Sequence, residues 1–300
     1  MFVIAGATGH VGSATAHTLL DADADADVGA EVRVLVRREA DTAPWRQAGA
    51  ETATVDLTDR AGLTAALTGA AGFFALLPFD LGAADLNAHA ELLSDAIAGA
   101  VAEAGVPHVV MLSSGGADLA AGTGPITGLH RLERALGETG TTLTALRSGH
   151  FQEKVSDVID LARETGTYPV FAPTAEAPVP MVATRDLGAV AARALLAPPP
   201  SSEAVDIIGP SRSERDVAEV LGRALGRALT VEIVPEAAWA PALTAVGFAP
   251  HVADSLAELY RADAAGLLAP RGDRSITVTT TVEETIAGLV GHASDAGAPS

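Results

Sequence analysis

Residues 2–12 read Phe-Val-Ile-Ala-Gly-Ala-Thr-Gly-His-Val-Gly, a short apolar run followed by glycines at positions 6, 9 and 12. The apolar run predicts a β-strand, and residues 13–20 predict a helix. Gly6 permits a sharp turn, Gly9 lets the backbone approach a pyrophosphate, and Gly12 lets the helix pack close to the strand. The helix N-terminus adds unpaired N–H groups and a partial positive charge. The stretch therefore predicts a dinucleotide site; a glycine-rich turn without a ligand is the alternative.

The end of the second predicted strand, residues 31–36, indicates which dinucleotide is bound. Arg37 and Arg38 follow it directly. Folds that select NAD usually carry Asp or Glu here to hold the ribose 2′-hydroxyl, whereas an arginine suits the 2′-phosphate of NADP. The pair predicts NADP(H) as the cofactor, with Arg37 as the phosphate ligand. The alternative is that both arginines are solvated residues of a loop without a ligand.

Alternating strands and helices continue through the first half of the chain. Predicted strands near 51–55, 72–77 and 108–112 are separated by predicted helices near 61–67 and 86–104. This is the pattern of an α/β, doubly wound parallel sheet, whose ligands lie at the carboxyl ends of the strands. The residues expected to bind the dinucleotide are therefore Gly6, Thr8, Gly9, His10, Val11, Gly12, Arg37, Asp56, Leu57, Leu77, Pro78, Ser113 and Ser114.

The composition excludes several classes of protein. The chain has 38 acidic and 19 basic residues and a net charge of −19, which disfavours nucleic-acid binding. It has no cysteine, so disulfides and thiolate chemistry are excluded. No apolar run reaches the roughly 18 residues of a membrane span, and the chain starts in its first strand rather than in a leader. We therefore expect a cytoplasmic protein.

The second half of the chain predicts a smaller substrate lobe. Helical stretches between 235 and 266 carry Trp239 and Tyr260, and they are interrupted by Pro and Gly. A purely structural cap or a subunit interface is the alternative. The predicted division is an NADP-binding domain at 1–150 with 181–210 returning to its sheet, a lobe at 151–180 and 211–290, and a tail at 291–300.

An alternating Asp-Ala run occupies residues 21–27. It predicts a solvated helix end or loop, because no turn glycine or bidentate Glu follows at the spacing of a calcium loop. The histidines also lack the spacing of metal ligands. No metal site is expected.

These motifs resemble the NmrA-like family of atypical short-chain dehydrogenases/reductases, in the branch of NAD(P)H:quinone and azo-dye reductases. The resemblance implies a Rossmann core with a small lobe over the nicotinamide. It also implies hydride transfer from NADPH to a quinone-like or conjugated aromatic or carbonyl acceptor. The matching segments are 6–12, 34–37, 56–59, 73–78, 104–106, 112–114, 130–133, 146–151 and 185–187.

Two departures from the related patterns affect the chemistry. Ordinary short-chain dehydrogenases use Tyr-x-x-x-Lys, in which the lysine lowers the tyrosine pKa. Neither Tyr168 nor Tyr260 has a lysine four residues later, because Lys154 is the sole lysine. The NmrA-like pattern Arg-Pro-Gly-x-Phe-Met-x-Asn is also broken, since Ser148 and Lys154 replace its proline and final asparagine. The substrate specificity is therefore expected to differ.

Three side chains are candidates for catalysis: His130, His150 and Ser113. His130 is expected to begin a helix, roughly where a conventional relative has its tyrosine. The helix N-terminus disfavours a protonated imidazole there, which favours hydrogen bonding over acid catalysis. His150 and Ser113 follow strand ends at the same edge. A solvent-facing histidine and a polar strand end are the corresponding structural alternatives, and the absence of G-x-S-x-G excludes a hydrolase.

Two other functions stay open at this point. A biosynthetic ketoreductase would need a proton donor, and a non-catalytic NADP(H)-sensing regulatory protein would bind a protein partner. For the enzyme, the expected partner is a small aromatic or quinone-like molecule, not a nucleic acid or a membrane. A homodimer is left open.

Overall fold

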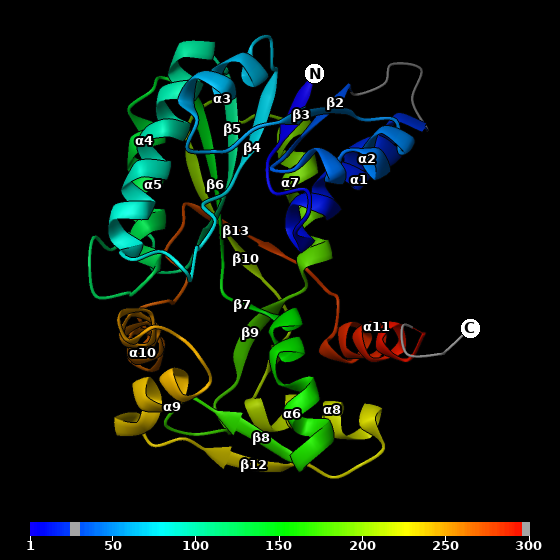
Figure 1. The fold of residues 1–300 in the computed structure, drawn as a ribbon, viewed down its shortest axis with the longest axis vertical. Coiled ribbons are helices and arrows are strands. Elements are labelled where there is room, and N and C mark those ends of the chain that lie inside the picture. The colour runs from blue at the N-terminus through cyan, green and yellow to red at the C-terminus, as the bar shows by residue number, and fades with distance from the viewer. Residues whose placement is uncertain (25–30, 296–300) are drawn as a thin grey trace.

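An eight-stranded parallel sheet forms the centre of the molecule (Figure 1). The computed structural model describes residues 1–24 and 31–295. The strand order is β13-β10-β6-β5-β4-β1-β2-β3, so the chain reverses its direction of winding between β1 and β4. Ligands of such sheets bind at this switch point, outside the carboxyl ends of the strands. The strands are β1 (Phe2–Ile4), β2 (Val32–Val36), β3 (Glu51–Thr54), β4 (Gly72–Ala75), β5 (His108–Ser114), β6 (Thr142–Ser148), β10 (Glu203–Ile208) and β13 (Arg274–Thr277).

Helices cover both faces of this sheet, which confirms the predicted doubly wound α/β class (Figure 1). The central strands are apolar along their length because both of their faces are buried, and Ile4 and Phe74 are 0% exposed. Two separate apolar clusters result, one on each face. On one face lie α3 (Arg60–Leu67), α4 (Leu86–Ala104) and α5 (Ile126–Gly137); on the other lie α1 (His10–Ala24), α2 (Ala43–Gln47) and α7 (Thr184–Leu196).

The helix ends follow the capping signals in the sequence. Asp85 accepts hydrogen bonds from the N–H groups of Asn87 and Ala88 at the start of α4, and Gly105 ends that helix at a φ of 64°. The predicted helix 86–104 is therefore confirmed. None of the helices in the described ranges is long and apolar enough to cross a membrane.

The remaining elements form a lobe beyond the carboxyl edge of the large sheet (Figure 1). A third apolar cluster holds much of it together, with Val155, Tyr168, Leu221 and Ile286 among its members. The elements are β7 (His150–Phe151), η2 (Gln152–Val158), α6 (Ile159–Thr165), β8 (Thr167–Val170), β9 (Val179–Val182), β11 (Ser211–Arg212), α8 (Glu214–Leu225), β12 (Thr230–Ile233), η3 (Glu236–Ala238), α9 (Trp239–Ala245), α10 (Pro250–Ala264) and α11 (Val282–Asp295). The short helix η1 (Glu39–Asp41) follows β2.

The structure differs from the sequence prediction in the last third of the chain. Residues 274–277 form β13, which pairs with β10 in the large sheet, so the segment 211–290 is not all lobe. The predicted tail at 291–300 is partly helical, because α11 continues to Asp295. An edge strand of four mostly polar residues carries too weak an apolar pattern to be found from sequence alone. Residues 25–27 of the acidic run lie outside the described residues.

Candidate active site

The glycine turn between β1 and α1 has the shape that the sequence predicts. Gly6 adopts a φ of 66°, which disfavours any side chain, and the Gly9 N–H donates to the Gly6 carbonyl oxygen at 2.9 Å. A Cβ at Gly12 would collide with the carbonyl oxygen of Gly6. The turn therefore packs against the start of α1 with no side chain between them, an arrangement typical of helix N-termini that bind anions.

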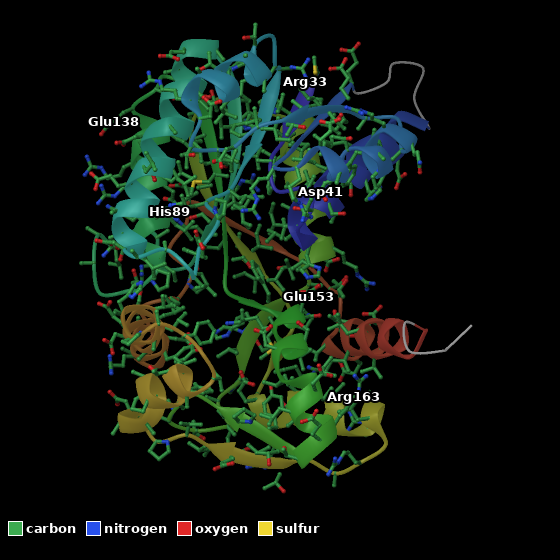
Figure 2. The ribbon with its side chains drawn as sticks, viewed as in Figure 1. Arg33, Asp41, His89, Glu138, Glu153 and Arg163 are labelled. Carbon is green, nitrogen blue, oxygen red and sulfur yellow. The ribbon has the colours of Figure 1, made fainter. Side chains whose placement is uncertain are left out.

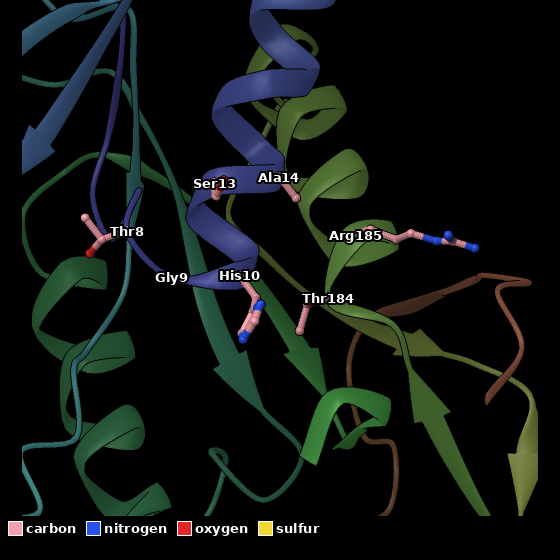
Figure 3. A pocket seen from close by; sticks show the side chains of 7 residues that line it. All are labelled: Thr8, Gly9, His10, Ser13, Ala14, Thr184 and Arg185. Carbon is pink, nitrogen blue, oxygen red and sulfur yellow. The ribbon is translucent and has the colours of Figure 1, made fainter. Parts of the chain in front are cut away.

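A shallow pocket of about 350 Å³ lies at this helix N-terminus, between the starts of α1 and α7 (Figure 3). The two helices approach closely because Gly188 packs against Ala14 and Thr15. Figure 3 shows the Arg185 side chain pointing away from the glycine turn, where it donates to Thr280 Oγ1 and pairs with Glu284. Anion binding in this pocket would thus depend mainly on backbone N–H groups. Its lining residues are Thr8, Gly9, His10, Ser13, Ala14, Thr184 and Arg185.

The two arginines after β2 have different roles. Arg38 is held by Asp41 of η1 through two hydrogen bonds of 2.9 Å, and Figure 2 labels that aspartate. Arg37 is exposed and makes no hydrogen bond or ion pair with any residue in the described ranges. The pKa of Asp56 is lowered by hydrogen bonds from Thr58 and, to a smaller extent, by the Arg37 charge. Arg37 therefore lies near the end of β3 with its guanidinium available.

The other expected cofactor residues follow β3, β4 and β5 at the same edge of the sheet. Leu57 and Leu77 are 9% and 5% exposed and belong to the apolar cluster beneath α3 to α5. Asp56 is exposed, whereas Pro78 and Ser114 are half-buried. The topology brings all of them to the switch-point edge, next to the glycine turn.

Ser113 belongs to a buried polar network. Its hydroxyl donates to Glu133 Oε1 at 2.5 Å, and Arg147 donates to both oxygens of the same carboxylate at 3.0 and 2.6 Å. The side chains of Arg147 and Glu133 are only 10% and 12% exposed. The network joins β5, α5 and β6, and it occupies the Ser113 hydroxyl that was predicted to take part in catalysis.

His130 lies in the second turn of α5, not at its first residue, because the helix begins at Ile126. The expected effect of the helix N-terminus on this side chain is therefore weaker than predicted. The ring Nδ1 lies 2.8 Å from the Ala117 carbonyl oxygen. Since a carbonyl only accepts, Nδ1 carries the hydrogen and Nε2 is left free in the neutral ring. His130 is half-buried, so Nε2 can serve as a contact for an acceptor.

His150 pairs with the lobe. Its Nε2 lies 3.1 Å from Asp263 Oδ2 on α10, without the alignment of a good hydrogen bond. Burial disfavours the charged ring, but Asp263, with help from Glu214, outweighs that cost and raises the pKa of His150. The predicted contact residue thus connects β7 to α10, and Asp263 is a neighbour that its sequence position did not reveal.

We expect Asp263→Asn to lower stability only at the lower end of the pH range. A histidine whose folded pKa is raised contributes stability below its unfolded pKa of about 6.5, and this is lost as pH rises through the folded value. Both side chains are nearly a third exposed, so the difference from the wild type should be about 1 kcal/mol or less near pH 5. Urea unfolding across pH measures it, and a difference that does not vary with pH would contradict the assignment.

An aromatic group lies on the same face of α10. Tyr260 packs against Phe171 with ring centroids 5.4 Å apart and meets the edge of Trp239 at 5.9 Å. Burial raises the pKa of Tyr260. The other tyrosine, Tyr168, is buried in the lobe and donates to Glu214 at 2.7 Å. Tyr260 is therefore the less buried of the two tyrosines, and it lies on the helix that also carries Asp263.

The lobe is fixed against the sheet edge by the loop that follows β5. Gly115 and Gly124 have no room for a Cβ, because the backbone of Leu268 and Ser255 lies against them. Arg271 donates to Asp118 at 2.7 Å, which adds an ion pair across the same contact. These close approaches were not predicted, since single glycines in a loop carry no specific signal.

The chain matches known proteins over most of its length. The model of the NmrA-like family matches residues 1–280. The chain is 28% identical to the NAD(P)H azoreductase of Xenophilus azovorans over 264 residues, which are 87% of this chain and 86% of that one. It is 32% identical to the (4-alkanoyl-5-oxo-2,5-dihydrofuran-3-yl)methyl phosphate reductase of Streptomyces griseus over 234 residues, 77% and 76% of the two chains.

Solved structures share the fold. An NADPH-dependent quinone oxidoreductase from Escherichia coli, complexed with NADPH, has a TM-score of 0.74 at 22% identity over 96% of this chain and 99% of that chain. The triphenylmethane reductase of Citrobacter sp., complexed with NADP(H), has a TM-score of 0.78 at 19% identity over 96% and 100% of the two chains.

Proposed function

The chain belongs to the NmrA-like family, and we propose that it is an NADPH-dependent oxidoreductase acting on a quinone-like or conjugated aromatic or carbonyl acceptor. The named relatives support this choice. They include reductases of azo compounds and of an unsaturated lactone that bears a phosphate ester. The observation that carries the cofactor assignment is the glycine turn, where a Cβ at Gly12 has no room, together with the unpaired Arg37 after β2. The cytoplasmic location remains a prediction, and the oligomeric state is left open as before.

The cofactor would be held mainly by the backbone. NADPH, when bound, supplies a hydride from its nicotinamide ring. The N-terminus of α1 would bind the pyrophosphate, and Arg37 would neutralise the 2′-phosphate. Asp56, Leu57 and Leu77 would contact the rest of the dinucleotide, with Pro78 and Ser114 toward its nicotinamide end. The lobe helix α10 would help to keep water from the reacting atoms.

A quinone or ketone takes up a proton as well as a hydride. Nε2 of His130 is our candidate for the contact with the acceptor oxygen, because the Ala117 carbonyl holds Nδ1 and orients the ring. Ser113 is a weaker candidate, since its hydroxyl already donates to Glu133. His150 is a weaker one too, because it pairs with Asp263.

We expect His130→Ala to lower kcat at least tenfold with an activated ketone, about the low end for general acid catalysis. The matched control is His17→Ala, which removes a ring that packs on Trp45 at 4.8 Å. Steady-state kinetics with NADPH separates the outcomes. A rise in KM without a fall in kcat would restrict His130 to binding.

The first test of the proposal follows NADPH absorbance with purified protein and a panel of quinones, azo dyes and activated ketones, with NADH in parallel. Rapid NADPH loss with one acceptor class would support the reductase. Tight NADP(H) binding without consumption would instead favour a cofactor-sensing protein, which is the reading that competes with it.

A further inference from the structure

Unpaired basic side chains are rare in this acidic chain. Carboxylates outnumber basic groups two to one, and most arginines pair with one or bond to a carbonyl. In the described ranges, the lysine and arginine side chains without a hydrogen bond or ion pair are Arg37, Lys154, Arg193 and Arg223. Each of them calls for a physical explanation.

Two of the four are explained by their helices. Arg193 and Arg223 lie in the last turns of α7 and α8. A cation there is stabilised by the negative end of the helix dipole. Arg37 has its own explanation in the proposed 2′-phosphate contact. Lys154 remains, and it follows β6 and β7 beyond the carboxyl edge where ligands of this fold bind.

The carboxylates closest to Lys154 in sequence do not pair with it. Glu153, labelled in Figure 2, accepts hydrogen bonds from the N–H and Oγ1 of Thr184, at 2.9 and 2.7 Å, and so caps α7. Asp157 lies one turn further along η2, where its charge acts on the Tyr260 hydroxyl. The Lys154 charge in turn acts on His150. The exposed ammonium therefore lies within electrostatic reach of His150, which contacts Asp263 of α10.

We infer that Lys154 binds an anionic substituent of the acceptor, such as a sulfonate, phosphate or carboxylate, while the conjugated ring packs near Phe171 and Tyr260. The inference rests on the proposed reductase function and specifies its substrate class. A protein with a net charge of −19 repels anions at long range, so an anionic acceptor needs a local cation. The reaction is unchanged: acceptor, NADPH and one proton give the reduced acceptor and NADP⁺.

The test compares two acceptors that differ by one anionic group, 1,2-naphthoquinone and 1,2-naphthoquinone-4-sulfonate. The ratio of their kcat/KM values is measured in the wild type and each variant, which cancels their intrinsic difference in electrophilicity. Lys154→Gln should shift the ratio about tenfold against the sulfonate, the size of a charged hydrogen bond. Lys154→Arg should keep most of the preference. Arg223→Gln removes the same charge from another unpaired site and should leave the ratio unchanged.

A second measurement keeps the two proposals distinguishable. Calorimetry follows naphthalene-2-sulfonate binding to the NADP⁺-loaded protein and needs no turnover. If the wild type reduced neither quinone, the reductase proposal would fail, while weaker sulfonate binding in Lys154→Gln would still support the anion contact. An unchanged acceptor ratio and unchanged binding would overturn it. An equal rise in the NADPH KM with both quinones would also overturn it and assign Lys154 to the cofactor.

Discussion

Replacing Arg37 by Asp is expected to raise the KM for NADPH about 100-fold and to leave the KM for NADH within about twofold. The 2′-phosphate would lose a charge-assisted contact and gain a repelling carboxylate, together worth about 2.7 kcal/mol. The neighbouring cation Arg38 is directed at Asp41, whose two carboxylate oxygens accept hydrogen bonds from it. The measurement is steady-state kinetics with each coenzyme at a saturating acceptor concentration.

The matched control for this variant is Arg38→Asp. It makes the same change of charge one residue away, but the side chain that it removes pairs with Asp41 and is 77% exposed. We expect the NADPH preference to change less than about threefold, since the lost ion pair is solvated. Similar losses for NADPH and NADH in Arg37→Asp would remove Arg37 from the phosphate role. If both variants raised the KM for NADPH equally, the cause would be the change of charge near the site and not a specific contact made by Arg37.

The parts of the site that could be predicted are those coded by short, local patterns. The glycine turn is one, because the sharp turn at Gly6 and the close packing at Gly12 require glycine whatever surrounds them. The position of Arg37 is another, since it follows from the end of one strand. The doubly wound α/β class followed from the alternation of strands and helices, whereas the order of the strands in the sheet came from the structure.

What could not be predicted depends on residues brought together by the whole fold. Glu133 lies 20 residues from Ser113 and 14 from Arg147, on a different element from each. Its sequence context shows only a charge on a helix. The contact between His150 and Asp263 is more distant still, because α10 reaches β7 only through the placement of the lobe. The division of roles between Arg37 and Arg38 likewise depended on where η1 places Asp41.

The second large effect is expected from Glu133→Ala, which should lower the free energy of unfolding by about 3–5 kcal/mol. The variant leaves the guanidinium of Arg147 buried without its carboxylate and the Ser113 hydroxyl without its acceptor. The burial of the unpaired Arg147 guanidinium then destabilises the fold far more than the loss of its contact with Glu133 would by itself. The melting temperature should fall by roughly 10 °C, measured by circular dichroism.

The control is Glu138→Ala, which breaks the exposed pair with Arg134 on the same helix. Figure 2 shows Glu138 at the outer surface of α5, and these side chains are 72% and 69% exposed. We expect its effect to stay within about 0.5 kcal/mol. The double variant Glu133→Leu, Arg147→Met should be more stable than Glu133→Ala, because two apolar groups need no partner. A double variant less stable than Glu133→Ala would contradict this account, because the buried, unpaired charge of Arg147 would then not be the main cost of losing Glu133.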